Sequence, residues 1–132
     1  KDDEPMLSDG EYNLFTMQYP YSPMPVISAD IITEDGTELD FGNDKIKVMH
    51  TPGHSAGSSC FLVETDNENY MFAGDTIFKD SIGRSDGYSG DYIVQKSTLE
   101  KLKALNKDYI ILSGHGEATT LEEEKRYNPF LR

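Results

Sequence analysis

A chain of 132 residues is long enough for one domain, or for one piece of a larger domain. Its 24 acidic side chains outnumber 12 lysines and arginines, and the resulting net charge of −12 repels phosphate backbones and disfavours a nucleic-acid partner. No apolar run approaches the roughly 18 residues of a membrane span, so no membrane partner is expected. The single cysteine, Cys60, excludes an internal disulfide and suits a reducing cytoplasm.

The first part of the chain is predicted to be irregular. Residues 1–27 form a lead-in segment, and its stretch from Tyr19 to Pro25 cannot be helical, because its prolines lack a backbone donor and clash with a preceding helical turn. A β pattern begins at residues 29–33, predicted to be a short strand ahead of a turn at residues 34–36. The polar opening without an initiator Met indicates a chain that begins at a cut.

Three further segments have the pattern of strands. Residues 46–50 alternate apolar and polar side chains, as a half-buried strand does. Residues 58–64 and 70–73 are mostly apolar and flank the turn-forming residues 66–69, so a hairpin is predicted. Cys60 lies in the first arm of this hairpin and is predicted to be a buried thiol.

Two helices and a buried strand are predicted in the last third of the chain. Asp91 can cap a helix that runs to about Leu105, with leucines at helical spacing. Residues 109–112 are predicted to form a buried strand. Residues 119–123 contain a capping box and open a helix that ends near Asn128. Strands followed by helix, strand and helix indicate one α/β domain.

Four side chains that could carry chemistry lie at or just after the ends of predicted strands. His50 ends the first alternating strand and His54 follows it, Asp75 comes after the hairpin, and His115 after the last strand. Loops at strand ends are where ligands and catalytic groups concentrate, and imidazoles with a carboxylate suit zinc, iron or manganese. The long gaps between these residues match no short-range metal motif, so spacing alone favours ordinary polar residues at loop starts.

The literal sequence around these residues resembles the metallo-β-lactamase superfamily, and in particular its short glyoxalase-II-like (hydroxyacylglutathione hydrolase-like) hydrolases. The similarity runs from about residue 28 to the C-terminus and is carried, in order, by TPGHSAGS, GDT, SIGRSDGYSGD, GHG and EEEKRYNPFL. The resemblance implies that residues 1–132 are a single partial domain. This would be half of a four-layer αββα sandwich of class α/β (α+β), with a mainly antiparallel or mixed sheet and two flanking helices.

The resemblance also implies roles for individual residues. His54 matches a ligand of a first metal, Asp75 the catalytic carboxylate that bridges both metals, and His115 a ligand of the second. His50 occupies a position that the family varies, and it is expected to have no ligand role. Arg84 matches a substrate-binding position of some thioester-hydrolysing relatives, although a structural pair with Asp86 is equally compatible with the sequence.

One departure from the family is expected to limit metal binding. The HxHxDH motif, which supplies further ligands to both metals, is absent from this chain. Two divalent ions, zinc first and iron or manganese as alternatives, are expected in the intact protein. Here each ion would keep only two protein ligands: His54 and Asp75, or Asp75 and His115. Binding by these residues alone is therefore expected to be weak or absent.

The resemblance implies an intact enzyme that hydrolyses a thioester or another ester-like carbonyl of a small molecule through a metal-bound hydroxide, with these residues alone inactive. A mononuclear-iron persulfide dioxygenase is the alternative, since its relatives carry similar GRSD and EE…NP segments; a non-catalytic fragment is another. The net charge counts against a nuclease. A missing N-terminal half, or a second copy of the chain, is expected to cover an otherwise exposed sheet face.

Overall fold

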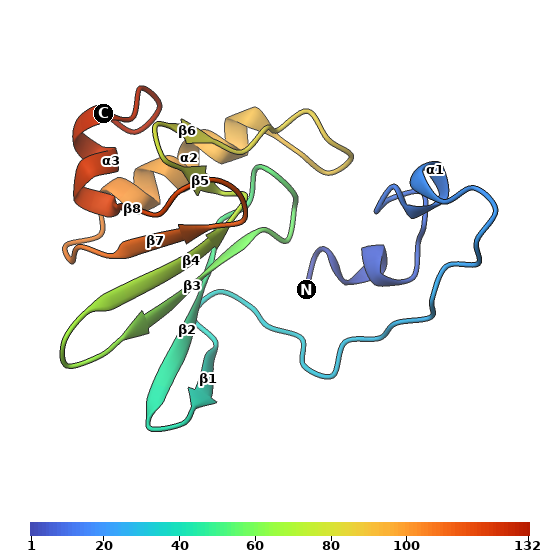
Figure 1. The fold of residues 1–132 in the computed structure, drawn as a ribbon, viewed down its shortest axis with the longest axis horizontal. Helices are drawn as coiled ribbons and strands as arrows, with labels where there is room; N and C mark the ends of the chain where they lie inside the picture. Colours follow the sequence, from blue (N-terminus) through green and yellow to red (C-terminus); the bar gives the residue numbers. More distant parts are fainter.

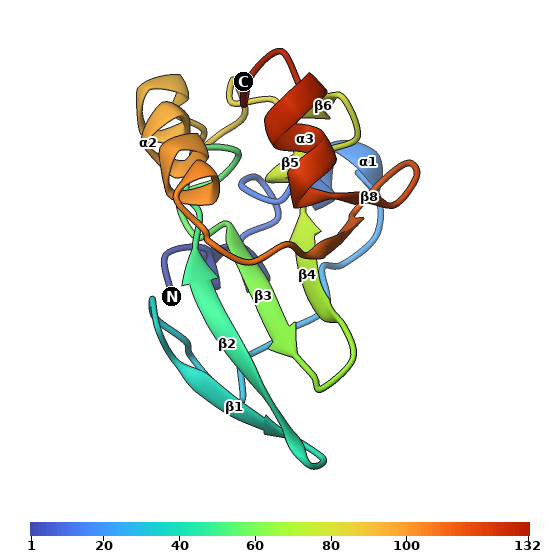
Figure 2. The same cartoon turned by 90° about the vertical axis from the view of Figure 1, so that its left-hand side faces the viewer.

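The computed structural model describes residues 1–132, and its centre is a six-stranded mixed sheet in the order β1-β2-β3-β4-β7-β8. Neighbouring strands pair antiparallel, except that β4 and β7 run parallel (Figures 1 and 2). This mixed sheet confirms the predicted fold class. The strands are β1 (Glu38–Phe41), β2 (Asp44–His50), β3 (Ser59–Glu64), β4 (Asn69–Gly74), β7 (Ile110–Ser113) and β8 (Thr119–Thr120).

Two helices pack on one face of the sheet, and both begin where the capping residues predict. The Asp91 side chain accepts hydrogen bonds from two backbone N–H groups at the start of α2 (Tyr92–Lys103). The Thr120 hydroxyl accepts one from the N–H of Glu123 at the start of α3 (Leu121–Tyr127). Each cap satisfies donors that have no partner within the helix. None of the helices has the length and apolar content needed to cross a bilayer.

The core lies between these helices and one face of the sheet (Figure 1). Alternate residues of β3 and β4 point into it, as the twofold period of a strand requires. Cys60 is fully buried there, which confirms the prediction of a buried thiol, and burial raises its pKa. The core residues are Cys60, Leu62, Met71, Ala73, Ile77, Leu99, Leu102, Tyr109, Ile111, Leu121 and Leu131.

The opposite face of the sheet is apolar but has no helix on it. Phe61 and Phe72 are directly paired across β3 and β4, and the two residues are 37% and 47% exposed. Val48 and Val63 lie in the same sheet and are buried, but they do not belong to the core cluster under the helices. The sheet therefore presents apolar side chains on both faces, which is the pattern of a sheet covered on both sides.

The predicted strand at residues 29–33 is wrong. These residues form no strand, and Ile31 and Ile32 are 67% and 55% exposed. The edge beside β2 is taken instead by β1, which the sequence analysis did not predict. A strand requires a neighbour to accept its backbone hydrogen bonds, and a short apolar run carries no information about whether one is available.

The lead-in segment contains two single-turn helices, η1 (Glu4–Leu7) and α1 (Phe15–Gln18), and residues 19–25 are not helical, as predicted. Its start is tied to the loop between β2 and β3 by Asp3, whose carboxylate accepts hydrogen bonds from the Ser55 hydroxyl and from the N–H of Gly57. A short hairpin, β5 (Ile77–Phe78) with β6 (Ser81–Ile82), follows β4 and was not predicted.

Candidate metal centre

The topology of the sheet brings three loops to one edge. Since β4 and β7 are parallel, their carboxyl ends lie together, and the N–H of Gly114 donates to the carbonyl of Gly74 at 2.7 Å. Two successive antiparallel pairings make β2 parallel to β4, so the loop after β2 reaches the same edge. This edge carries His54 after β2, Asp75 after β4 and His115 after β7.

These three side chains converge on one carboxylate oxygen. The Nε2 atoms of His54 and His115 lie 3.6 Å and 3.5 Å from Oδ2 of Asp75. His115 is the most open of the three, with a side chain 78% exposed, and its ring lies near Phe78 at 6.1 Å between centroids. Residues far apart in the sequence thus share a single site, with the carboxylate between two imidazoles.

Hydrogen bonding determines which nitrogen of His54 faces the carboxylate as an acceptor. Its Nδ1 lies 2.7 Å from the backbone carbonyl of Arg84. A carbonyl only accepts, so Nδ1 carries the proton and the neutral ring keeps its lone pair on Nε2, toward Asp75. A backbone carbonyl on the second nitrogen is the arrangement that typically orients metal-binding histidines.

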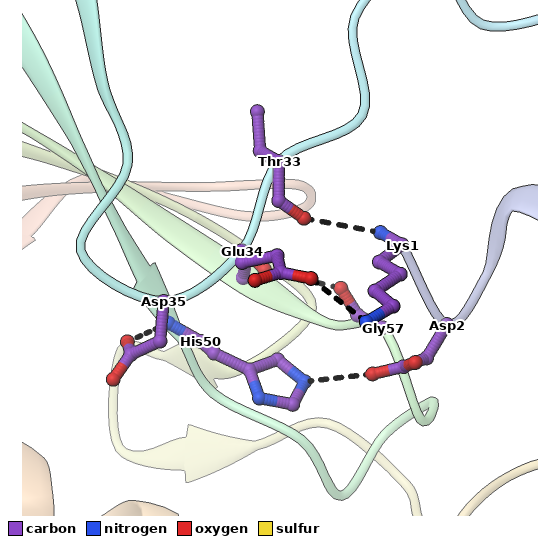
Figure 3. A pocket seen from close by; sticks show the side chains of 8 residues that line it. Lys1, Asp2, Thr33, Glu34, Asp35, His50 and Gly57 are labelled. Carbon is purple, nitrogen blue, oxygen red and sulfur yellow. Dashed lines mark hydrogen bonds and ion pairs between the residues drawn. The ribbon is translucent and has the colours of Figure 1, made fainter.

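His50 has the opposite arrangement and lies in a different place. Its Nε2 is hydrogen-bonded to the carbonyl of Ala56 at 2.8 Å and faces the carboxylate of Asp2 at 3.8 Å (Figure 3). Its backbone N–H donates to Asp35. His50 therefore lies outside the group formed around Asp75, and its lack of a ligand role stays a prediction.

Arg84 contributes its backbone to the site, while its side chain is engaged elsewhere. The guanidinium makes two hydrogen bonds to Asp86, at 2.6 Å and 3.1 Å, and this contact lowers the pKa of that carboxyl. The structural pair with Asp86, one of the two roles compatible with the sequence, is thus present. A substrate-binding role for Arg84 stays a prediction.

Two glycines pack closely around Asp75. A Cβ atom at Gly114 would lie 2.4 Å from Oδ1 of Asp75, and one at Gly83 would lie 1.8 Å from its backbone oxygen. Neither glycine has a positive φ. These positions therefore require glycine for space rather than for backbone conformation.

Gln95 supports the site from helix α2 and was missed by sequence reasoning. Its side chain is buried, and its Nε2 donates to the carbonyl of Gly83 at 2.6 Å, directly before Arg84, whose carbonyl holds His54. A signal was present in the sequence: Gln95 precedes Leu99 and Leu102 at helical spacing, so it is a polar residue on the apolar side of the helix.

The donor set fits divalent cations only in part. Two imidazole nitrogens and a shared carboxylate oxygen are suitable ligands for zinc or iron. No group of three or more His, Cys, Asp or Glu side chains is arranged to hold an ion by itself. The described residues therefore offer two imidazoles and one carboxylate, fewer ligands than a closed metal site requires.

Sequence comparison with known proteins places this chain among the relatives of one superfamily. The profile of the metallo-beta-lactamase superfamily matches residues 1–115, so the similarity includes the lead-in segment. An uncharacterised protein of Mycobacterium leprae is 42% identical over 110 residues, covering 83% of this chain and 49% of that protein. The hydroxyacylglutathione hydrolase GloC of Haemophilus influenzae is 39% identical over 99 residues, covering 74% of this chain and 46% of that protein.

Two solved structures extend the similarity to the fold. The BLEG-1 B3 metallo-beta-lactamase is 32% identical with a TM-score of 0.85, over 98% of this chain and 61% of that one. TTHA1623, solved in a di-iron-bound form, is 31% identical with a TM-score of 0.78, over 98% of this chain and 62% of that one. The chain spans about half the length of the curated relatives it matches. It belongs to the metallo-beta-lactamase superfamily.

Proposed function

We propose that this protein, in its intact form, hydrolyses an ester-like carbonyl, with a thioester as the leading substrate class, at the centre formed by His54, Asp75 and His115. The observation that carries the proposal is the convergence of two imidazoles on one oxygen of Asp75. It is supported by relatives named hydroxyacylglutathione hydrolase in Haemophilus influenzae and probable metallo-hydrolase in Bacillus subtilis.

The residues of this chain would share two divalent ions. His54 and Asp75 would hold the first, and Asp75 and His115 the second. We propose zinc, with iron or manganese as the alternatives; the di-iron form of TTHA1623 supports a two-metal arrangement. Bound there, divalent cations would supply Lewis acidity and lower the pKa of water toward about 7.

The protein side chains would orient the reaction. Asp75 can accept a proton from the attacking water and pass it to the leaving group, since it is only partly exposed and faces both imidazoles. The proton on Nδ1 of His54, held by the Arg84 carbonyl, keeps Nε2 available as a ligand. No protein nucleophile is required, and Cys60 is fully buried in the core.

We further propose that additional polypeptide completes both the centre and the fold. Catalytic zinc sites usually have three protein ligands, whereas this chain offers two for each ion. The exposed pair of Phe61 and Phe72 also requires a cover. A preceding N-terminal segment is our first choice and a second copy the alternative. The single buried cysteine suits a reducing cytoplasm, where we expect the protein to act on a small molecule.

Histidine variants of the full-length protein test the proposal. His54→Gln and His115→Gln should each remove metal and reduce thioester hydrolysis at least 100-fold, because each removes one of few ligands. His50→Gln is the matched control and should retain both. Equal losses in all three variants would contradict the assignment. Oxygen uptake on a persulfide by iron-loaded protein, without thioester hydrolysis, would instead assign a dioxygenase.

A further inference from the structure

We propose that a cavity between the lead-in segment and the loop after β6 binds the apolar acyl chain of the substrate. This inference rests on the proposed hydrolysis at the neighbouring metal centre and deepens it by naming a substrate class. The cavity has a volume of about 390 Å³, within the range of small-molecule sites. Its lining includes Met6, Tyr12, Leu14, His54, Arg84 and Tyr88.

The cavity borders the metal centre through His54, while Asp75 and His115 are not part of its lining. His54, whose Nε2 faces Asp75, forms part of its wall, and Arg84 holds the other nitrogen of that imidazole through its carbonyl. A chain attached to a carbonyl at the centre would therefore enter this cavity on the His54 side. The position distinguishes it from the polar pocket around His50, which has no apolar side chain in its lining.

Two aromatic rings form one wall across a large gap in sequence. Tyr12 and Tyr88 stack with their ring centroids 3.9 Å apart and their planes 22° from parallel. Figure 1 shows the loop between β6 and α2 reaching toward the lead-in segment, which carries Tyr12. Stacked aromatic rings present a broad, rigid apolar surface.

Leu14 adds an apolar side chain held in an unfavourable conformation. Its backbone has φ of 63°, a left-handed value that non-glycine residues rarely adopt, yet its side chain is 54% exposed. Backbone strain of this kind costs about 1–3 kcal/mol and clusters at ligand-binding sites. Exposed apolar area and local strain thus occur together at the mouth of one cavity.

The walls are fixed to the loop that carries His54. Asp3 ties the lead-in segment to this loop by accepting hydrogen bonds from Ser55 and Gly57. On the other side, the N–H of Ala56 donates to the hydroxyl of Ser89 at 3.1 Å, next to Tyr88. These bonds attach both walls of the cavity to the loop that carries His54, as a subsite that positions a substrate requires.

The chemistry of the lining favours an uncharged chain. Arg84 is the single cationic side chain, and its guanidinium is already paired with Asp86. A charged peptide such as glutathione would find no free partner for its carboxylates here. An aliphatic or aromatic acyl group would bury apolar surface against Tyr12, Leu14 and Tyr88 and gain affinity in proportion to the area buried.

A chain-length series tests the inference in the full-length, metal-loaded protein. With p-nitrophenyl esters from acetate to octanoate, kcat/KM should rise up to about fourfold for each added methylene. Tyr88→Ala and Leu14→Ala should each lower the octanoate-to-acetate ratio at least tenfold, while Tyr88→Phe should largely restore it. Tyr127→Ala, an exposed tyrosine on α3, is the control and should leave the ratio unchanged.

A binding measurement separates failure of the subsite from failure of the reaction. Titration calorimetry should give tighter binding of octanoate than of acetate, and Tyr88→Ala should remove the difference. Ester hydrolysis without any dependence on chain length would overturn the subsite and leave the proposed reaction intact. Octanoate binding that depends on Tyr88, without hydrolysis of any ester or thioester, would support the subsite and refute the reaction.

Discussion

Gly114→Ala is the most direct test of how the carboxylate between the imidazoles is held. The new Cβ would lie 2.4 Å from Oδ1 of Asp75, whereas ordinary contacts begin at 3.4 Å, so the carboxylate must retreat by about 1 Å. Metal–ligand distances tolerate only about ±0.2 Å. Because Asp75 would serve both ions, we expect a loss of at least 100-fold in metal affinity and in kcat/KM.

The assay compares this variant with Gly42→Ala, in the turn between β1 and β2, where no atom beyond the chain neighbours lies within 4 Å of the new Cβ. Because Gly42 has φ of 63°, this variant controls for a loss of stability away from the site. Metal affinity is measured by competition with a chelator, hydrolysis with a thioester, and folding by thermal unfolding of both proteins. Gly114→Ala should remain folded, because the severe contact is with a side-chain carboxylate, whereas the backbone of Gly74 lies 3.3 Å or more from the new Cβ. Retention of metal affinity and rate within about threefold of wild type would refute the role of Asp75.

Two further predictions concern supporting interactions. Gln95→Met keeps a side chain of similar shape but leaves the Gly83 carbonyl without its hydrogen-bond donor. The free energy of unfolding, measured in urea, should fall by about 1–3 kcal/mol, and kcat/KM should also fall. Hydrogen bonds from Lys107 and Tyr109 lower the pKa of Glu64. The ionised Glu64 therefore stabilises the folded protein above pH 4.5, and this stabilisation is lost as the pH falls through the lowered pKa. Tyr109→Phe should therefore make stability less dependent on pH below 4.5; an unchanged acid profile would contradict this.

Local signals predicted the helices and the hairpin because their causes are local. Asp91 and Thr120 satisfy the N–H groups of the residues directly after them, so the sequence alone locates both helix starts. The turn between β3 and β4 is likewise short, and their pairing follows from it. The strand expected at residues 29–33 failed because its existence depends on a distant partner, and β1 occupies the available edge.

The candidate site depends both on local sequence motifs and on strand pairing between distant segments. Family motifs pointed to His54, Asp75 and His115, but their meeting depends on the parallel pairing of β4 with β7, which spans a long crossover and has no local signal. Gln95, at helical spacing, and Gly83, within SIGRSDGYSGD, both have a sequence signal, but neither signal says which atoms these residues contact. Their importance lies in atoms that touch only after folding: an amide against a carbonyl, and empty space beside Asp75.

The uncovered face of the sheet can be tested by comparing two phenylalanines. Phe72 lies on this face and Phe130 lies near the C-terminus, and they are almost equally exposed, at 47% and 45%. If further polypeptide covers the face of β3 and β4, Phe72→Thr should lower the free energy of unfolding of the full-length protein by about 3 kcal/mol or more. Phe130→Thr should lower it much less. Urea unfolding at several protein concentrations measures the difference. A cost that is independent of concentration indicates a cover from the same chain, whereas one that grows with concentration indicates a second copy. Equal, small costs for both variants would mean that the face stays open to solvent and that the fold needs no completion.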